Sequence, residues 1–286
     1  MMLNTNKKIL IVGLGLIGGS YARAFTKLGF EVSAITRSRD SIDYALQEGI
    51  IAKGATTPDP ALIGEAELII FSLYPTVFLD WIKNNQSHFK PGALLTDVTG
   101  VKTSVVYEIQ NLLREDVEFI AAHPMAGKEV YGVQNSDERI FHGANYIVTP
   151  TAKNTPAAIR DCLEIGKLLG FGKVCTLSPE KHDEMIGFVS QLTHCIAVSL
   201  MTCYDDKEKL QDYTGDSFRD LTRIARINDE MWSELFLMNK EPLLAQMDKF
   251  LDEFSRLRTA LQEDDRESIR AMMRLSTTRR ALFDKK

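Results

Sequence analysis

The sequence predicts an α/β protein, with an N-terminal domain built on a parallel sheet and an all-helical C-terminal domain. Short apolar runs alternate with longer helix-like segments up to about residue 150, a glycine-rich turn follows the first run, and no strand pattern survives beyond residue 178. Strands that alternate with helices favour a parallel sheet with crossover connections. A chain of 286 residues also exceeds the usual domain of about 100 to 200 residues, so two domains are expected.

The strands of this sheet are predicted from six apolar runs, at 7–12, 31–36, 67–72, 93–98, 118–122 and 144–150. A helix over 156–169 and a strand over 173–177 would extend the sheet. From Ser178 the pattern becomes helical, and Ser178-Pro179-Glu180 is typical of a helix N-cap and first turn. We therefore expect domains at 1–177 and 178–286. The long helices have wide apolar faces, which favour a homodimer because such a face often completes its core against a second copy.

Composition narrows the class of protein. The net charge of -5 offers no broad basic surface, so nucleic acid is not an expected partner. The apolar run after Lys8 is too short for a signal peptide, and we expect no apolar stretch near the roughly 20 residues that span a membrane. The cysteines form no CxxC pair, which favours reduced thiols over a disulfide or zinc framework. They are Cys162, Cys175, Cys195 and Cys203. A cytoplasmic protein is expected.

The glycine-rich turn predicts a dinucleotide site. Gly13, Gly15 and Gly18 follow the first strand, and Leu16 and Ile17 begin a helix. In this arrangement the first glycine makes the tight turn, the second lets the backbone approach a pyrophosphate, and the third lets helix and strand pack closely. The helix N-terminus attracts the anion. The alternative is a glycine turn with a purely structural role.

The end of the second strand bears on the choice of cofactor. An NAD site usually has a carboxylate there for the ribose hydroxyls, but this chain has Thr36-Arg37-Ser38. Arg37 could bind a 2′-phosphate as a bidentate fork, and Thr36 and Ser38 could donate hydrogen bonds, so NADP is favoured over NAD. The alternative is that Arg37 and Arg39 are solvated and Asp40 caps the next helix.

Three segments carry candidate chemistry. The segments 96–102 and 123–127 each follow a predicted strand, at the sheet edge where open α/β folds bind ligands, and 218–226 lies on a predicted helix. His123 has an ordinary pKa near 6.5 and stands directly after a strand, which suits a general base; the alternative is a capping or loop histidine. The other histidines outside these segments, His88, His142 and His182, are treated as surface or structural. No metal-ligand spacing is evident.

Five motifs together resemble the prephenate and arogenate dehydrogenases: GLGLIGGS, HPMAG, QLTH, FRDLTRIA and MWSELFLMNK. The similarity runs from about Lys8 to beyond Leu261. The resemblance implies a Rossmann domain followed by a helical dimerisation domain, with the active site between them. It also implies oxidative decarboxylation of a cyclohexadienol with NAD(P) on the route to tyrosine.

The resemblance also implies roles for individual residues. His123 matches the catalytic base, His194 a substrate-site histidine, and Arg223 the arginine that binds the ring carboxylate. Glu129 matches an acidic residue that pairs with that arginine. The alternatives are a core histidine for His194 and, for Arg223, a solvated basic face shared with Arg219 and Arg226.

Three positions depart from the family pattern. Many relatives carry serine where this chain has Gly100, so Thr99 or a water would have to supply a hydroxyl beside His123. Gln191 replaces a histidine and Lys128 a threonine, and both are candidate substrate contacts. Two other classes stay open: a β-hydroxyacid dehydrogenase, which would use a lysine on a long helix, and a non-catalytic redox sensor, which would need no opposed histidine and arginine.

Overall fold

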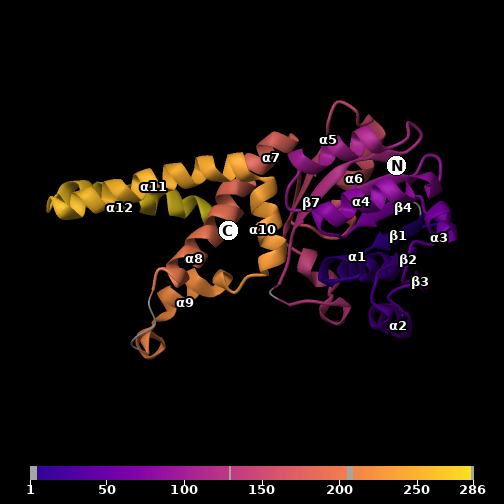
Figure 1. Ribbon diagram of the computed structural model, residues 1–286, viewed down its shortest axis with the longest axis horizontal. Coiled ribbons are helices and arrows are strands. Elements are labelled where there is room, and N and C mark those ends of the chain that lie inside the picture. Colours follow the sequence, from indigo (N-terminus) through magenta and orange to yellow (C-terminus); the bar gives the residue numbers. More distant parts are fainter. Residues whose placement is uncertain (1–4, 129, 205–208, 285–286) are drawn as a thin grey trace.

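The computed structural model describes residues 5–128, 130–204 and 209–284. A part containing the sheets lies at one end of the long axis, and an elongated helical part lies at the other (Figure 1). The helical hairpin of α11 (Lys240–Gln262) and α12 (Arg266–Arg280) extends away from the sheets.

The main sheet has six strands in the order β3-β2-β1-β4-β5-β6, and all its pairs are parallel. Its strands are β1 (Lys8–Val12), β2 (Glu31–Ile35), β3 (Lys53–Ala55), β4 (Leu68–Phe71), β5 (Leu94–Asp97) and β6 (Glu118–Phe119). This order reverses direction between β1 and β4, where doubly wound folds bind their ligands. The predicted fold class, a Rossmann-type parallel sheet followed by helices, is confirmed.

Helices cover both faces of this sheet. They are α1 (Leu16–Lys27), α2 (Arg39–Gln47), α3 (Pro60–Glu65), α4 (Pro75–Asn85), α5 (Thr103–Leu112) and α6 (Pro156–Leu168). Successive residues of β1 belong to different cores because strand side chains alternate. Ile9 and Ile11 pack with α1, α2 and α6, whereas Leu10 and Val12 pack with α3, α4 and α5. Both faces are therefore buried, as is usual for parallel sheets.

A second, smaller sheet corrects the prediction of one continuous parallel sheet. The run 118–122 divides between β6 and β7 (Ala121–Met125), and β7 pairs antiparallel with β8 (Asn145–Thr149). β9 (Lys173–Thr176) then pairs parallel with β8. An apolar run indicates a strand but not its direction or its sheet, which explains the error. β3 was also missed, because Lys53-Gly54-Ala55 has no apolar run.

The helical part begins where the change of period predicted it. Pro179 is the first residue of α7 (Pro179–Ile186), and the Ser178 hydroxyl accepts a hydrogen bond from the Lys181 N–H. The helix continues through a π turn at Gly187–Leu192 into α8 (Thr193–Thr202). The shorter helices α9 (Asp216–Thr222) and α10 (Asp229–Met238) precede the hairpin.

One apolar stretch contradicts the expectation made from the sequence. The continuous helix Pro179–Thr202 has 24 residues and a mean hydropathy of 1.4 over its most apolar window, so by length and composition it could cross a membrane. Only 28% of that window is buried within the chain. The first turns of this helix nevertheless carry charged residues that contact the sheet part, as described below.

Candidate active site

The turn between β1 and α1 has the geometry expected of a dinucleotide site. Gly13 has a φ of +96°, and a Cβ there would lie 2.2 Å from the Ser72 carbonyl oxygen. A Cβ on Gly18 would lie 1.9 Å from the Gly13 carbonyl oxygen. A Cβ on Gly15, in contrast, would meet no atom within 4 Å. Packing therefore requires glycine at 13 and 18, while Gly15 borders open space that a pyrophosphate fits.

The start of α1 suits an anion. Leu16 and Ile17 are its first residues, Gly15 is its N-cap without a side-chain hydrogen bond, and no acidic residue lies in its first turn. The first N–H groups of a helix have no partner within the helix and attract negative charge. A cofactor phosphate would satisfy them.

The end of β2 places Arg37 on the surface beside this turn. Ser38, rather than Asp40, caps α2, because the Ser38 hydroxyl accepts from the Ser41 N–H at 3.1 Å. Arg39 forms an exposed ion pair with Asp43. The alternative in which Asp40 caps the helix is therefore wrong, and the two arginines have different surroundings.

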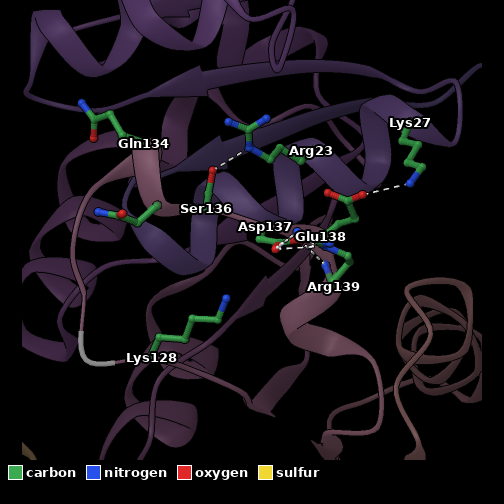
Figure 2. A pocket seen from close by; sticks show the side chains of 9 residues that line it. Arg23, Lys27, Lys128, Gln134, Ser136, Asp137, Glu138 and Arg139 are labelled. Atoms are coloured by element: carbon green, nitrogen blue, oxygen red, sulfur yellow. Dashed lines mark hydrogen bonds and ion pairs between the residues drawn. The ribbon is translucent and has the colours of Figure 1, made fainter.

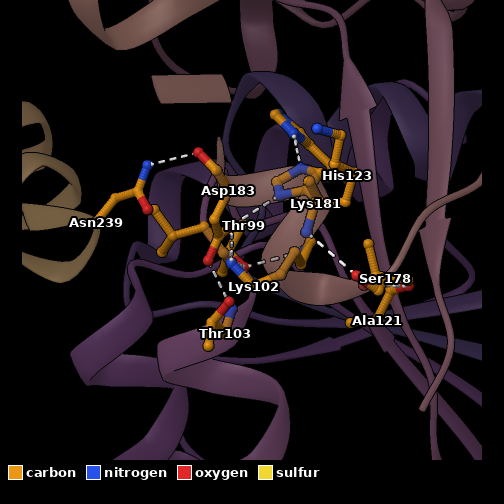
Figure 3. A network of polar contacts seen from close by, with 12 residues as sticks. Thr99, Lys102, Thr103, Ala121, His123, Ser178, Lys181, Asp183 and Asn239 are labelled. Carbon is orange, nitrogen blue, oxygen red and sulfur yellow. Dashed lines mark hydrogen bonds and ion pairs between the residues drawn. The ribbon is translucent and has the colours of Figure 1, made fainter. Parts of the chain in front are cut away.

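His123 lies within β7, opposite Ile147, and not in a loop after a strand. Its Nδ1 is 2.9 Å from Nε2 of His182, and Nδ1 of His182 is 2.8 Å from an Asp183 carboxylate oxygen. His182 and Asp183 are buried on α7. The Asp183 carboxylate also accepts the backbone N–H groups of Lys102 and Thr103, at 2.9 and 2.8 Å, where α5 begins (Figure 3).

A buried ion pair holds the residue before His123. The Lys102 ammonium lies 2.7 Å from the Asp97 carboxylate, and neither side chain is exposed to solvent. Asp97 accepts the Ala122 N–H at 3.0 Å, and Lys102 donates to the Ala122 carbonyl at 2.7 Å. The N–H of Ala122 is thus bound to a negative charge, and its carbonyl oxygen is bound to a positive one. We call Asp97 and Lys102 the backbone clamp.

Electrostatics keep His123 neutral. Burial holds the pKa of His123 well below its ordinary 6.5, and the neighbouring His182 and Lys102 lower it further. Burial also lowers the pKa of His182, although the hydrogen bond to Asp183 acts in the opposite direction. An imidazole that is uncharged at pH 7 can accept a proton, so the site can supply a general base.

His194 and Arg223 lie on the helical part. His194 is half-buried in α8, where its Nδ1 donates to the Ser190 carbonyl at 2.9 Å and its ring stacks on Trp232 of α10 with centroids 3.8 Å apart. Arg223 begins a 3₁₀ turn (Arg223–Ala225) that packs against α8. Arg219 instead pairs with Asp216 on the surface.

The π turn orients the helix that carries both histidines. In a regular α-helix of 3.6 residues per turn, two residues twelve positions apart would lie about 120° apart around the axis. A π turn adds one residue, which brings His182 and His194 to within about 20° of each other. The irregular turn therefore aims both rings toward the same side of the helix.

Several predicted contacts lie elsewhere. Gln191 is buried between helices, where its amide donates to the Leu235 carbonyl and accepts from Asn239. The Thr99 hydroxyl donates to Asp97 and accepts from Lys102, and the hydrogen-bond partner of the His123 ring is His182. Gln191 and Thr99 were predicted as candidate substrate contacts from their positions in the sequence motifs, which do not reveal these hydrogen-bond partners.

Lys128 lines a polar hollow of about 560 Å³ with Arg23 of α1 and Asp137 (Figure 2). Its ammonium helps to lower the pKa of the Asp137 carboxyl, after the larger effect of Arg139. Glu129 lies outside the described residues.

Sequence reasoning missed His182, Asp183 and the backbone clamp. A signal for the first two existed: Pro179, His182, Asp183 and Ile186 are the buried residues of α7 and follow the i, i+3, i+4, i+7 spacing of a core-facing stripe. Two polar residues on such a stripe need partners, because burying a polar group without a hydrogen bond is costly. Among the described residues no group of side chains suits a metal ion.

The fold and the turn define a dinucleotide-binding protein of the Rossmann class, and its second sheet carries a half-buried histidine on β7 that is hydrogen-bonded to α7. Residues 21–174 match the model of the prephenate dehydrogenase nucleotide-binding domain, and residues 178–275 match that of the prephenate dehydrogenase dimerization domain. The chain therefore belongs to the prephenate dehydrogenase family.

Individual relatives agree with this membership. The prephenate dehydrogenase of Bacillus subtilis is 31% identical over 267 residues, covering 91% of this chain and 72% of that protein. The cyclohexadienyl dehydrogenase of Zymomonas mobilis is 29% identical over 287 residues, covering 95% and 97%. The structure of Aquifex aeolicus prephenate dehydrogenase with hydroxyphenyl propionate and NAD+ superimposes with a TM-score of 0.89 at 28% identity, covering 97% and 98%.

Proposed function

We propose that this chain catalyses the oxidative decarboxylation of prephenate or arogenate with hydride transfer to NAD(P), giving 4-hydroxyphenylpyruvate or tyrosine in tyrosine biosynthesis. The observation that carries the proposal is the half-buried His123 on β7, whose Nδ1 lies 2.9 Å from Nε2 of His182, which in turn is hydrogen-bonded to Asp183. The two rival classes are less well supported, because the best-placed proton acceptor is a histidine on a strand and not a lysine on a long helix.

The reaction follows from the chemistry of the substrate. His123 takes the proton of the ring C4 hydroxyl while C4 becomes a carbonyl and loses its hydrogen as hydride. The bound cofactor supplies the hydride acceptor. The ring C1 carboxylate then leaves as carbon dioxide, and its bonding electrons complete the aromatic ring. Because aromatisation is strongly favourable, the step is effectively irreversible.

The helical part is proposed to bind the substrate. Arg223 binds the ring carboxylate, since a guanidinium fork matches a carboxylate better than an ammonium does. His194 contributes from α8 on the same side of the helix as His182. We further propose a division into domains 1–177 and 178–286, with the active site between them, and Glu129 as the residue that pairs with Arg223.

The cofactor is proposed to be NADP in preference to NAD. Thr36, Arg37 and Ser38 end β2 without a carboxylate that would repel a 2′-phosphate. Arg37 is exposed there and available to a bound phosphate, while Ser38 also caps α2.

A second copy of the chain is proposed to cover the apolar side chains that the helical part exposes. The large ones on α8, α11 and α12 are Met201, Leu244, Leu251, Phe254, Leu261, Met273 and Leu275, and the π turn exposes Phe188 and Val189. Residues 178–275 match a family model described as a dimerization domain, which favours a homodimer. Burial in a dimer also accounts for the apolar helix Pro179–Thr202 without a membrane, in agreement with a cytoplasmic enzyme.

Steady-state kinetics with both substrates and both cofactors tests the reaction. We expect cofactor reduction with release of carbon dioxide from prephenate, arogenate or both. A protein that binds the nucleotide but reduces it with neither substrate would favour a sensor. Reduction with β-hydroxyacids alone would favour the other dehydrogenase class.

A further inference from the structure

The hydrogen bonds around His123 have a direction that begins at Asp183. Its carboxylate accepts two backbone N–H groups, from Lys102 and Thr103, and these contacts favour the ionised form. An ionised carboxylate only accepts hydrogen bonds. The Nδ1 of His182, 2.8 Å from Asp183, must therefore carry a proton.

The same direction continues to His123. With a proton on Nδ1, the neutral ring of His182 has a lone pair on Nε2 and accepts there. The atom facing it at 2.9 Å is Nδ1 of His123, which must donate. The remaining nitrogen of His123, Nε2, then carries the lone pair.

We propose that His182 and Asp183 are positioning residues that hold the proton of His123 on Nδ1 and so keep Nε2 as the base. The inference rests on the proposed function only in naming the proton that Nε2 receives. In an unconstrained neutral imidazole the proton can sit on either nitrogen, and its position is set by the hydrogen bond that the other nitrogen makes. A histidine in the opposite tautomer would present an N–H to the substrate hydroxyl and could not take its proton.

The surroundings of His123 support this division of work. The titratable groups that act on His123 are His182 of α7 and Lys102, and these are bound in turn to Asp183 and Asp97. The backbone clamp holds the main chain through both polar groups of Ala122, whereas His182 contacts the His123 ring itself. The main chain beside His123 is therefore fixed by Asp97 and Lys102, and the ring of His123 is fixed by His182 and Asp183.

Gly100 leaves the loop between β5 and α5 without a side-chain hydroxyl at that position. A serine there would contribute a hydroxyl on the loop between β5 and α5, but glycine has none. A Cβ at Gly100 would lie 3.6 Å from Leu235, an ordinary contact, so space does not exclude a side chain. In this structure the hydrogen-bond partner of His123 comes from α7. This helix is bound in turn to the residue before α11, because the Asn239 amide donates to the Asp183 carbonyl at 3.0 Å.

Two variants of His182 separate positioning from packing. His182→Gln keeps a carbonyl that can accept from His123, whereas His182→Phe keeps a ring of similar size with no acceptor. We expect the Phe variant to lose turnover by about ten- to a hundredfold and the Gln variant to stay within about threefold of wild type. The KM of the cyclohexadienol substrate and the Kd of NADP should change little in either, and thermal unfolding should show that both are folded.

The ¹⁵N NMR spectrum of the histidine rings in the substrate-free protein provides a second readout. We expect the proton of His123 on Nδ1 in the wild type and in His182→Gln, and a mixture of tautomers in His182→Phe. A wild-type proton on Nε2, or equal losses of turnover in the two variants, would overturn the inference. The tautomer is measured without substrate, so a protein that oxidises neither prephenate nor arogenate would refute the proposed function and leave this measurement intact.

Discussion

The glycine turn after β1 and the site around the proposed base His123 on β7 are built in opposite ways. The turn is made by the backbone of six consecutive residues, and Gly13 and Gly18 are required there because a Cβ would collide with carbonyl oxygens. The base site is made by side chains from β5, the start of α5, β7 and α7. Local sequence therefore specifies the first, whereas the second exists only after four separate elements have come together.

The largest expected effect follows from removing the base itself. His123→Asn should lower kcat by about a hundred- to ten-thousandfold, the usual contribution of a general base, while the Kd of the cofactor stays nearly unchanged. Stopped-flow or steady-state assays of cofactor reduction measure the first, and fluorescence titration measures the second. A variant with near-normal turnover would remove His123 from the mechanism.

The backbone clamp should matter to stability more than any surface ion pair. Lys102→Met would leave the buried Asp97 carboxylate unpaired, which we expect to cost about 3–5 kcal/mol of unfolding free energy. The double variant Asp97→Asn with Lys102→Met removes both charges and should cost less than the single one.

Urea denaturation measures these differences, with Lys181→Met as the matched control. Lys181 pairs with Glu184 on the same helix as His182, but both side chains are exposed, so its loss should cost about 0.5 kcal/mol or less. If the double variant were less stable than Lys102→Met, charge pairing would not be what the clamp contributes.

The contrast between the two regions explains how far the sequence could be interpreted. The alternation of strands and helices, the turn at Gly13 and the start of α7 at Pro179 follow from local patterns and were predicted, whereas β3 and the second sheet were not. The buried partners of Gln191 and Thr99 could not be predicted, because a polar side chain in a motif looks the same whether it faces a cleft or a buried partner. His182 was dismissed because its partner, His123, is 59 residues away in sequence.

The direction of β8 and the π turn could not be predicted for a related reason. An apolar run has the same alternation in a parallel and an antiparallel pair. The π turn at Gly187–Leu192 begins with a glycine, but a single glycine within a helical pattern does not separate it from a regular helix, and the turn changes which residues share a face with His182. Both depend on contacts with distant segments.

Arg223 offers a test of whether the helical part binds the substrate. If it binds the ring carboxylate, Arg223→Ala should raise the KM for prephenate by an amount equivalent to about 1.5 to 3 kcal/mol, the range for a hydrogen bond to a charged group. Arg219→Ala and Arg226→Ala are the controls and should do much less, and the Kd of the cofactor should stay constant in all three. Equal, small effects would return Arg223 to the solvated surface.

Arg37 provides the corresponding test at the nucleotide end. Arg37→Asp should shift the cofactor preference from NADP toward NAD, because the carboxylate would accept from the ribose hydroxyls and repel a 2′-phosphate. The ratio of kcat/KM for the two cofactors measures the shift. Arg39→Ala is the control, since Arg39 pairs with Asp43. A wild type that already prefers NAD would contradict the role of Thr36-Arg37-Ser38 and leave the glycine turn unaffected.

The smallest expected effect is a shift of the acidic limb of the kcat pH profile to lower pH. Only the neutral form of His123 accepts a proton, so kcat should fall as the pH drops through its pKa. Burial, His182 and Lys102 hold that pKa well below 6.5, so the acidic limb should lie below pH 6.5. His182→Phe should not abolish the limb, whereas His123→Asn should.

The same pKa shift gives a stability effect of defined sign. In the unfolded chain His123 takes up a proton near pH 6.5, but in the folded chain it does so only at a lower pH. Between these values the unfolded state binds more protons, so the free energy of unfolding should decrease as the pH is lowered below about 6.5. Denaturation curves at a series of pH values measure this decrease. His123→Asn should reduce the slope, because one proton-binding group is gone; an unchanged slope would mean that other groups cause the acid sensitivity and that burial leaves the base site near the ordinary pKa.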